Sequence, residues 1–350
     1  METELEIKDL NVEFNSLGET KQVLHDISIR VCRNRKIGII GESGSGKTQT
    51  VLSILGLIEG KPGVVSGNIQ FKNRSILNSN ELNCKDWKEF YENRTQQIRG
   101  HEASIIFQDA KASLIPYQTI EEQAIETWKA LNGNDAVSTI VEKAALLLKE
   151  MKLSDTERVL KSYPNQLSGG ECQRAYIMLA LLGSPSLLIA DEPTSSLDRK
   201  NADILLKMIN NLCDLKDISL ILISHDLRDV IENTDYVYVF FNGNVIEEFS
   251  IESYSSDNGS TTPSHPYSKF LLSMADGRLI KQLKNDPKSV PLFENGAKNN
   301  FEDKSTGCPY YNYCELRKSQ SEEKQRKCMI EKPRLRTYLN ENKSACWYDK

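Results

Sequence analysis

The 350-residue sequence lacks the features that mark a membrane-spanning or secreted chain. No stretch reaches the ~18 consecutive apolar residues that a membrane span needs. The most apolar stretch, residues 176–190, is interrupted by Gly183, Ser184, Pro185 and Ser186. The N-terminus is acidic and has no apolar core, so it is not expected to be a signal peptide. We therefore expect a cytosolic chain, in which stable disulfides are rare.

An excess of basic residues is also missing. Lysine and arginine total 44 against 49 aspartates and glutamates, which gives a net charge of -5. Nucleic-acid-binding domains usually carry a basic footprint, so no nucleic-acid partner is expected. The apolar content of 39% and charged content of 27% are ordinary for a globular protein with a core. The length allows one large domain with an appendage, or two domains.

The hydrophobic pattern predicts an α/β fold. Residues 5–15 and 23–32 alternate like strands, and residues 119–182 are mostly helical in pattern. Short, wholly apolar strands are typical of a parallel sheet covered on both faces. The remaining predicted elements are strands at 36–40, 186–190 and 219–224, helices at 49–57, 201–215 and 267–275, a hairpin around Asn242-Gly243, and a polar linker at 250–266.

A glycine-rich stretch after the predicted strand 36–40 matches the phosphate-binding P-loop pattern G-x-x-x-x-G-K-[ST]. The stretch is Gly41, Glu42, Ser43, Gly44, Ser45, Gly46, Lys47 and Thr48. In such a loop, backbone N–H groups surround the phosphates at a helix N-terminus. Lys47 supplies a positive charge and the Thr48 hydroxyl can ligate Mg²⁺. The alternative is a structural glycine turn, but the preceding strand and following helix favour a nucleotide site.

Two further motifs extend the phosphate chemistry. An apolar strand ends at Asp191, which can hold the Mg²⁺ shell, and Glu192 follows it, where a carboxylate can activate the attacking water. The stretch Ser168, Gly169 and Gly170 opens a predicted helix and makes a second phosphate-binding N-terminus. A single monomer already has its phosphate site, so this second one needs a different explanation.

Together these motifs resemble those of ABC transporter ATPase subunits, in which the LSGG signature of one subunit contacts the γ-phosphate held by its partner. The resemblance implies further roles for matching residues. These are Gln108 as the Q-loop glutamine that senses Mg²⁺ and the transmembrane partner, His225 as the switch histidine on the γ-phosphate, Asp198 in the D-loop, and Phe14 as either an adenine-stacking ring or strand core. The signature departs from the family pattern at Glu171, where glutamine or methionine is usual.

The resemblance also implies the architecture. It predicts a P-loop ABC ATPase with a RecA-like core, an N-terminal antiparallel β subdomain and a helical signature subdomain at about 115–182, all within residues 1–250. Residues 251–350 would hold a linker, an HPY segment and a C-terminal cysteine region. None of the departures removes a catalytic group, so we expect ATP and Mg²⁺ to be bound and ATP to be hydrolysed.

The HPY segment, which begins at His265, is similar to that of oligopeptide, dipeptide and nickel importers. This subgroup implies a second, different ABC ATPase subunit, two transmembrane permeases and an extracellular substrate-binding protein. It places the chain peripherally on the cytoplasmic face of the cell membrane. Peptide is the favoured cargo and nickel or a metal chelate the alternative. A soluble ABC ATPase acting on nucleic acid or the ribosome, and a regulatory subunit without turnover, are lower alternatives.

Four of the eight cysteines fall in the last 43 residues, at Cys308, Cys314, Cys328 and Cys346. They resemble the C-terminal cysteines of some peptide-importer ATPases, which in several cases hold a [4Fe-4S] cluster. Four thiolates suit either an iron–sulfur cluster or Zn²⁺, and the absence of any metal is the third alternative. The other four cysteines, Cys32, Cys84, Cys172 and Cys213, are expected to be ordinary thiols.

Overall fold

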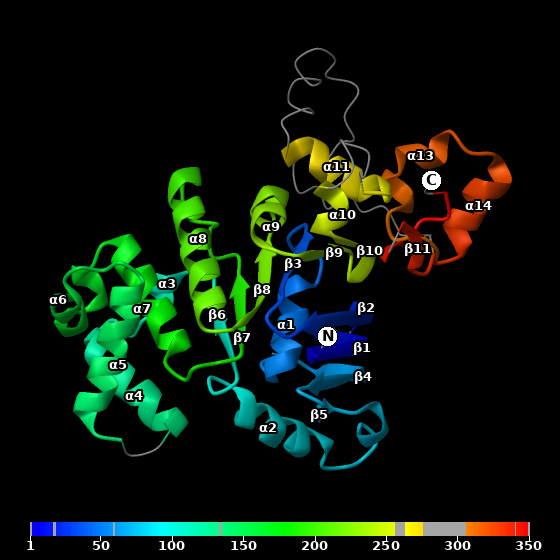
Figure 1. The fold of residues 1–350 in the computed structure, drawn as a ribbon. Coiled ribbons are helices and arrows are strands. Elements are labelled where there is room, and N and C mark those ends of the chain that lie inside the picture. The colour runs from blue at the N-terminus through cyan, green and yellow to red at the C-terminus, as the bar shows by residue number, and fades with distance from the viewer. Residues whose placement is uncertain are drawn as a thin grey trace.

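The computed structural model in Figure 1 describes residues 2–16, 19–58, 60–132, 135–255, 263–275, 306–339 and 341–348. Residues 256–262 of the predicted linker and the charged stretch that precedes the cysteine region lie outside the described residues. Within the described ranges, no helix is both long enough and apolar enough to cross a membrane.

The central layer is an eight-stranded sheet in the order β11-β12-β10-β9-β3-β8-β7-β6. Its parallel strands are β3 (Lys36–Gly41), β6 (Ala103–Ile106), β7 (Leu187–Asp191), β8 (Ser219–Ser224) and β9 (Tyr236–Phe241). Every residue of β7 and β8 is buried, which confirms the prediction of short apolar strands covered on both faces. Because these strands are parallel, their carboxyl ends meet at one edge of the sheet.

The predicted hairpin around Asn242-Gly243 is confirmed. Strand β10 (Asn244–Ser250) runs antiparallel to β9. Asn242 and Gly243 both have positive φ, 44° and 72°, the backbone that a two-residue turn of type I′ requires.

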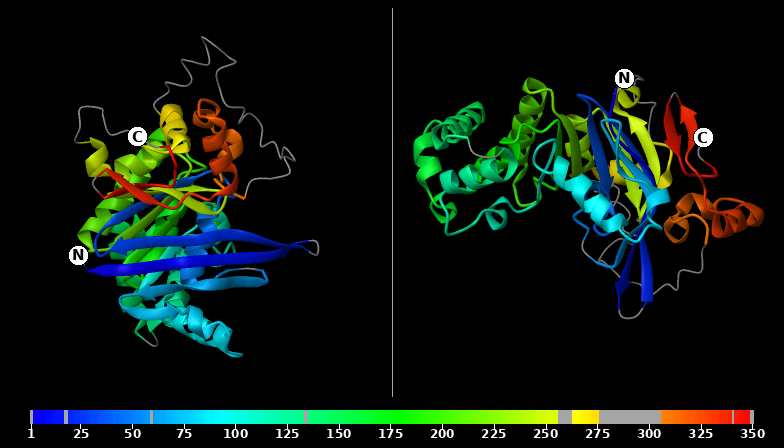
Figure 2. Two further views of the ribbon diagram at one scale, coloured as in Figure 1. Left: turned by 90° about the vertical axis from the view of Figure 1, so that its right-hand side faces the viewer. Right: turned by 90° about the horizontal axis from the view of Figure 1, so that it is seen from below.

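A second, antiparallel sheet lies beside the central one (Figure 2) and has the order β2-β1-β4-β5. Its strands are β1 (Thr3–Ser16), β2 (Glu19–Cys32), β4 (Pro62–Phe71) and β5 (Arg74–Leu77). Its inner side chains, such as Leu5 and Ile7, share one apolar cluster with Ile37 and Ile39 of β3. Helix α1 (Lys47–Leu55) adds Val51 and Ile54 to this cluster, so the helix that follows the glycine-rich loop is firmly anchored.

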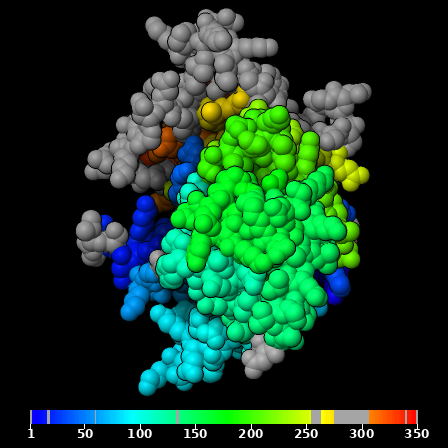
Figure 3. All heavy atoms as spheres, turned by 90° about the vertical axis from the view of Figure 1, so that its left-hand side faces the viewer, coloured from blue at the N-terminus to red at the C-terminus, as the bar shows by residue number. Residues whose placement is uncertain are grey.

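The predicted helical region forms a lobe at one end of the molecule and makes the face seen in Figure 3. Its helices are α4 (Ile120–Asn132), α5 (Val137–Glu150), α6 (Thr156–Lys161) and α7 (Gly169–Leu181), with a 3₁₀ turn at Pro164–Gln166. In α5 the side chains of Ile140, Ala144, Leu147 and Leu148 are buried, the spacing of one apolar helix face. That face belongs to the same cluster as Leu188 of β7 and Leu220 of β8, which joins the lobe to the sheet.

Five further helical segments lie outside the lobe and before residue 251. They are the 3₁₀ turn Ser79–Glu81, α2 (Trp87–Ile98), α3 (Ala110–Ser113), α8 (Arg199–Leu215) and α9 (Leu227–Asn233). Helix α8 follows β7 and precedes β8, so it forms the predicted β-α-β crossover.

The C-terminal extension is partly built into the central sheet, which the sequence pattern does not predict. Its elements are α10 (Ile251–Ser255), α11 (Pro266–Ala275), a 3₁₀ turn at Tyr311–Tyr313, α13 (Glu315–Lys318), α14 (Glu322–Ile330), β11 (Arg336–Leu339) and β12 (Asn342–Ser344). Strand β12 pairs antiparallel with β10, with Glu247 opposite Ser344. The edge of β10 offers unpaired backbone groups, and the polar segment Asn342–Ser344 satisfies them.

The predicted linker needs one correction at its start. Residues 251–255 form helix α10 instead of irregular chain. Asn342 of β12 accepts a hydrogen bond from the Ser250 N–H at 2.9 Å, and its amide donates to the Ser253 hydroxyl at 2.8 Å. A residue about 90 positions away therefore holds this short helix, and no local sequence pattern could have indicated it.

Candidate active site

The glycine-rich loop connects β3 to α1, as its pattern predicts. Gly44 and Gly46 have φ of 80° and 98°, a region that residues with a side chain rarely adopt. A Cβ on Gly46 would lie 2.5 Å from Leu24, and one on Gly41 would lie 2.3 Å from the Phe240 carbonyl oxygen. The loop therefore requires these glycines, and it ends at the N-terminus of α1, where backbone N–H groups face outward.

Lys47 is the first residue of α1 and its side chain is only 4% exposed. Its ammonium group donates hydrogen bonds to the carbonyl oxygens of Gly41 at 2.8 Å and Glu42 at 3.0 Å. It also lies 3.8 Å from the Glu192 carboxylate. Burial lowers the pKa of Lys47, and the neighbouring carboxylates partly oppose that shift. A buried ammonium held by carbonyl oxygens can exchange those partners for phosphate oxygens.

Thr48 and Asp191 form the second part of the site. The Thr48 hydroxyl donates to one Asp191 carboxylate oxygen at 2.9 Å. The other oxygen of that carboxylate is buried and has no hydrogen-bond partner among the described residues. Burial raises the pKa of Asp191. An unpartnered carboxylate oxygen beside a hydroxyl is a fitting donor set for Mg²⁺, which prefers oxygen ligands and keeps several waters.

Glu192 and His225 complete the cluster. A Glu192 carboxylate oxygen lies 3.3 Å from Nδ1 of His225, and the Glu192 N–H donates to the Ile223 carbonyl at 3.0 Å. The φ of Glu192 is 48°, a left-handed backbone that is unfavourable for any residue with a side chain. The structure thus brings the predicted Lys47, Thr48, Asp191, Glu192 and His225 together at the carboxyl ends of β3, β7 and β8.

The other predicted residues occupy separate places. Ser168, Gly169 and Gly170 are exposed at the start of α7 in the helical lobe, and no hydrogen bond or ion pair between described residues joins them to the Lys47 cluster. Glu171 accepts hydrogen bonds from the Ser168 N–H at 2.9 Å and hydroxyl at 2.8 Å, so this departure from the usual signature caps the helix. The signature surface is therefore free to face a different molecule.

Gln108, Phe14 and Asp198 also lie outside the cluster. Gln108 is exposed two residues beyond β6, which ends at the same sheet edge as β7. Phe14 is half-buried in β1 and packs so closely on Gly60 that a Cβ there would lie 2.8 Å from its ring. Asp198 caps α8 by accepting from the N–H and side-chain amide of Asn201 at 3.0 and 2.7 Å, and these hydrogen bonds lower its pKa.

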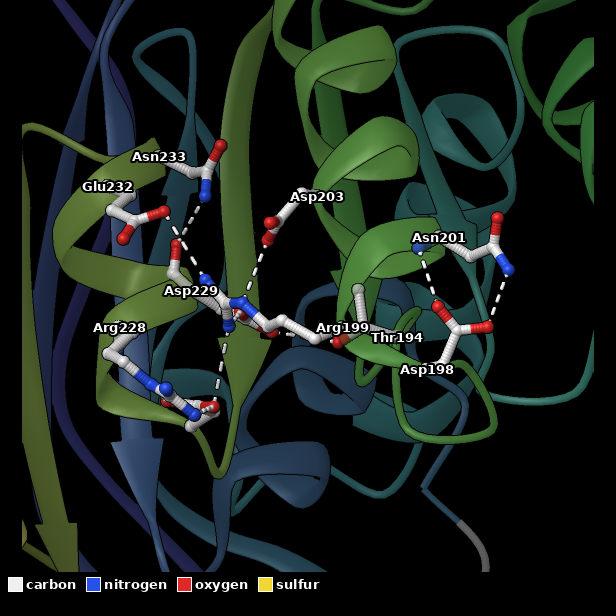
Figure 4. Close-up of polar contacts among 10 residues, drawn as sticks. Thr194, Asp198, Arg199, Asn201, Asp203, Arg228, Asp229, Glu232 and Asn233 are labelled. Atoms are coloured by element: carbon white, nitrogen blue, oxygen red, sulfur yellow. Dashed lines mark hydrogen bonds and ion pairs between the residues drawn. The ribbon is translucent and has the colours of Figure 1, made fainter. Parts of the chain in front are cut away.

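The residue after Asp198 is the centre of a charge network that the sequence analysis missed (Figure 4). The guanidinium of Arg199 lies 2.6 Å from Asp229, 2.9 Å from Asp203, 3.3 Å from Glu232 and 3.5 Å from Asp226. Asp229 is buried and also accepts from the Thr194 hydroxyl at 2.9 Å. The network ties the segment after Glu192 to the segment after His225. In the sequence, the network is marked only by Arg199 and by the acids Asp226, Asp229 and Glu232, which follow it by 27 to 33 residues.

The four C-terminal cysteines border one small cavity of about 20 Å³. His265 and Tyr310 border the same space. Burial raises the pKa of Cys308 to about 12 and also raises those of Cys314 and Cys328. Among the described residues, no three or more His, Cys, Asp or Glu side chains form a group that could hold a metal ion.

The comparison with known proteins decides the family. Residues 24–195 match the family model described as "ABC transporter". The oligopeptide transport ATP-binding protein AppD of Bacillus subtilis is 35% identical over 299 residues, which cover 84% of this chain and 86% of AppD. This chain belongs to the ABC transporter family of ATP-binding proteins. It is an ABC ATPase, as the order of its motifs predicts.

Other members of the ABC family match over different lengths. The oligopeptide transport ATP-binding protein OppD of Haemophilus influenzae is 30% identical over 345 residues, covering 98% of this chain and 96% of OppD. The dipeptide transport ATP-binding protein DppD of Lactococcus lactis is 32% identical and covers 77% of this chain and 72% of DppD. The match to OppD thus extends through the C-terminal extension.

Solved ABC structures share the fold. The dimeric bacterial ABC transporter cassette MJ0796 has a TM-score of 0.59 at 23% identity and covers 71% of this chain and 98% of its own. The cbiO1 protein of Clostridium perfringens has the same TM-score at 20% identity, with coverages of 81% and 100%. The predicted ABC ATPase fold class is confirmed by these neighbours together with the central sheet, the antiparallel sheet and the helical lobe.

Proposed function

We propose that this ABC ATPase hydrolyses ATP to power the import of oligopeptides or dipeptides through separate transmembrane permeases. The observation that carries the catalytic part is the convergence of Lys47, Thr48, Asp191, Glu192 and His225 at one edge of the parallel sheet. The peptide cargo is supported by the names of the relatives AppD, OppD and DppD, which describe oligopeptide and dipeptide transport ATP-binding proteins.

The proposed site divides the work among its residues. Residues Gly41 to Thr48 enclose the phosphates with backbone N–H groups, and Lys47 neutralises the β- and γ-phosphate charge. Thr48, Asp191 and Gln108 would hold Mg²⁺, which offsets the negative charge of the phosphate oxygens when bound. Glu192 accepts a proton from the attacking water, and His225 contacts the γ-phosphate.

A second nucleotide-binding subunit completes the machinery. The exposed Ser168, Gly169 and Gly170 would contact ATP held by the partner, and Asp198 would lie at the same interface. We propose a heterodimer that acts with two permeases and an extracellular binding protein on the cytoplasmic face of the membrane.

Residues 1–250 form the proposed ATPase domain, with residues 115–182 as its helical subdomain. Within this domain, Phe14 stacks on adenine. Residues 251–350 form the proposed extension.

A paired assay tests this function. Glu192→Gln keeps the shape of the side chain and removes the base, so the purified chain should still bind ATP while phosphate release falls at least about 100-fold. Lys47→Ala should weaken binding itself. Uptake of labelled dipeptides, longer peptides and Ni²⁺ by cells that express each variant then identifies the cargo. Unchanged turnover in Glu192→Gln would refute the catalytic assignment, and uptake of Ni²⁺ alone would refute peptide cargo.

We propose in addition that Cys308, Cys314, Cys328 and Cys346 hold a [4Fe-4S] cluster. The four thiols border one small cavity, and thiolates are the usual ligands of such a cluster. As they stand, the described side chains do not form a group that could hold a metal ion, so the proposal requires the thiols to draw together around the cluster. Burial raises the pKa of Cys308 and of Cys314, and backbone N–H groups oppose that effect: the N–H of Tyr310 at Cys308, and the N–H groups of Leu316 and Arg317 at Cys314. Hydrogen bonds to sulfur tune cluster potentials. Because all hydrolytic groups lie elsewhere, the role of the cluster would be structural.

Anaerobic purification tests the cluster directly. The wild-type protein should be brown and contain about four irons and four sulfides per chain. Cys314→Ser should lose iron, whereas Cys84→Ser, which changes an exposed thiol of the ATPase domain, should keep it. Colourless protein with four titratable C-terminal thiols would refute the proposal, and one equivalent of zinc without sulfide would replace it by a zinc site.

A further inference from the structure

The HPY segment touches the phosphate loop, a contact for which the proposed function gives no role. Tyr267 lies in the first turn of α11 and is fully buried. Its hydroxyl oxygen accepts a hydrogen bond from the backbone N–H of Glu42 at 3.2 Å. Glu42 is the second residue of the glycine-rich loop, and 225 positions separate it from Tyr267. A side chain of the C-terminal extension therefore contacts the backbone of the loop.

The same peptide group is held from its other side by Lys47. The Lys47 ammonium donates to the Gly41 carbonyl oxygen at 2.8 Å, and this carbonyl shares a planar peptide unit with the Glu42 N–H. The Lys47 ammonium has three N–H donors, so it can donate to phosphate oxygens while it still donates to this carbonyl. Tyr267 and Lys47 therefore hold the two ends of one peptide unit of the loop.

Tyr267 is itself held by its backbone and by its ring. The carboxylate of Glu247 in β10 accepts hydrogen bonds from the Ser264 and His265 N–H groups, and His265 Nδ1 accepts from the Tyr267 N–H at 3.1 Å. The ring packs edge-on against Phe241 at the end of β9, with 4.8 Å between centroids. A buried ring with its backbone anchored has little freedom to move its hydroxyl away from Glu42.

A second contact of the Tyr267 ring leads to the cysteine region. Tyr310 lies 5.5 Å from Tyr267 and 5.2 Å from Phe241 between centroids, and it is buried. Tyr310 follows Cys308 by two residues and borders the space that the four cysteines share. The packing of this region therefore sets the position of the Tyr267 ring, and through its hydroxyl that of the loop.

We propose that Tyr267 is a positioning residue for the phosphate loop and that the cysteine region holds it in place through Tyr310. The proposal rests on the assignment of the loop as an ATP site. On this proposal the C-terminal extension raises the affinity of the loop for ATP, with or without a cluster bound by the four C-terminal cysteines. Tyr267 does not touch the reacting atoms, so its effect should fall on ATP affinity more than on the turnover rate.

The first test removes one oxygen atom. In the full-length protein, Tyr267→Phe keeps the ring and should raise the Kd and KM for ATP about two- to tenfold, the effect of one hydrogen bond. Turnover at saturating ATP should stay within about twofold. Hydrogen exchange at the Glu42 amide should accelerate. The matched control is Tyr238→Phe, since that buried hydroxyl accepts from the Arg30 N–H of β2 at 3.0 Å instead of the loop.

The second test addresses the route from the cysteine region. Tyr310→Leu should raise the Kd for ATP as Tyr267→Phe does, and the double variant should be no weaker than Tyr267→Phe alone, because both act through one contact. Equal ATP affinity in wild type, Tyr267→Phe and Tyr238→Phe would overturn the positioning role. Additive losses in the double variant would overturn the route through Tyr310. A wild-type protein that binds no ATP would instead overturn the proposed function, on which this inference depends.

Discussion

Two substitutions, Glu192→Ala and Glu192→Gly, separate the energetic cost of the backbone conformation at Glu192 from the loss of its carboxylate. Its φ of 48° lies in the left-handed region, where a residue with a side chain is disfavoured by about 1–2 kcal/mol. Alanine retains this cost and glycine does not. Both variants lose the carboxylate and with it the contacts to Lys47 and His225, so those losses cancel when the two are compared.

The magnitude follows from two opposing effects. At ordinary backbone angles glycine is less stable than alanine by about 0.5–1 kcal/mol, because it loses more conformational freedom on folding. Relief of the left-handed strain at position 192 should exceed this penalty, so Glu192→Gly should be more stable than Glu192→Ala, by about 0.75 kcal/mol from the midpoints of the two ranges and by at most about 1.5 kcal/mol. Over 350 residues this shifts Tm by only about 1 °C, so urea unfolding is the better assay.

An alanine and a glycine variant at an ordinary helical position show the stability difference that is expected without left-handed strain. Glu142 is exposed in the interior of α5, and there glycine should be less stable than alanine by about 1 kcal/mol. Both Glu192 variants should lack ATP turnover. If Glu192→Gly were the less stable of its pair, as at Glu142, the argument for stored strain at the proposed catalytic carboxylate would be wrong.

Three further predictions concern the site and its supports. Arg199→Ala leaves the buried Asp229 without its cation and should lower the free energy of unfolding by about 1–3 kcal/mol. The control Lys200→Ala changes an exposed neighbour and should leave the free energy of unfolding unchanged. Equal urea midpoints for the two variants would contradict this prediction. Burial raises the pKa of Glu247 from 4.5 to about 7. The contribution of this group to the free energy of unfolding is therefore complete below pH 4.5, and about 3 kcal/mol of it is lost as pH rises from 4.5 to 7. Glu247→Gln should remove this part of the pH dependence. Thr48→Ala should raise the Mg²⁺ concentration for half-maximal turnover about tenfold, and an unchanged Mg²⁺ titration would exclude Thr48 as a ligand.

The strand, loop and helix around the P-loop could be predicted because their signals are local. An apolar run, required glycines and a helical pattern follow one another between residues 36 and 57, and β3 and α1 occupy that region. The Asn242-Gly243 turn is equally local, since its residue types suit the positive φ that the hairpin needs. Sequence also placed Asp191, Glu192 and His225 at strand ends, and parallel pairing then brought them together.

Features that depend on distant partners could not be predicted. Strand β12 is three polar residues long and lies between β10 and β11, so no local apolar pattern marks it. The contact between Tyr267 and Glu42 joins residues 225 positions apart. The left-handed backbone of Glu192 carries no signal either, because glutamate is not a residue that indicates positive φ. Each of these features is determined by the folded surroundings.

The central claim is that one carboxylate at the end of β7 drives ATP hydrolysis in this chain. Phosphate release by the full-length protein, measured with Mg²⁺ and ATP for the wild type and for Glu192→Gln, tests it most directly. The account predicts Mg²⁺-dependent release by the wild type, and ATP binding without appreciable release by Glu192→Gln. Equal release by the two proteins would contradict it.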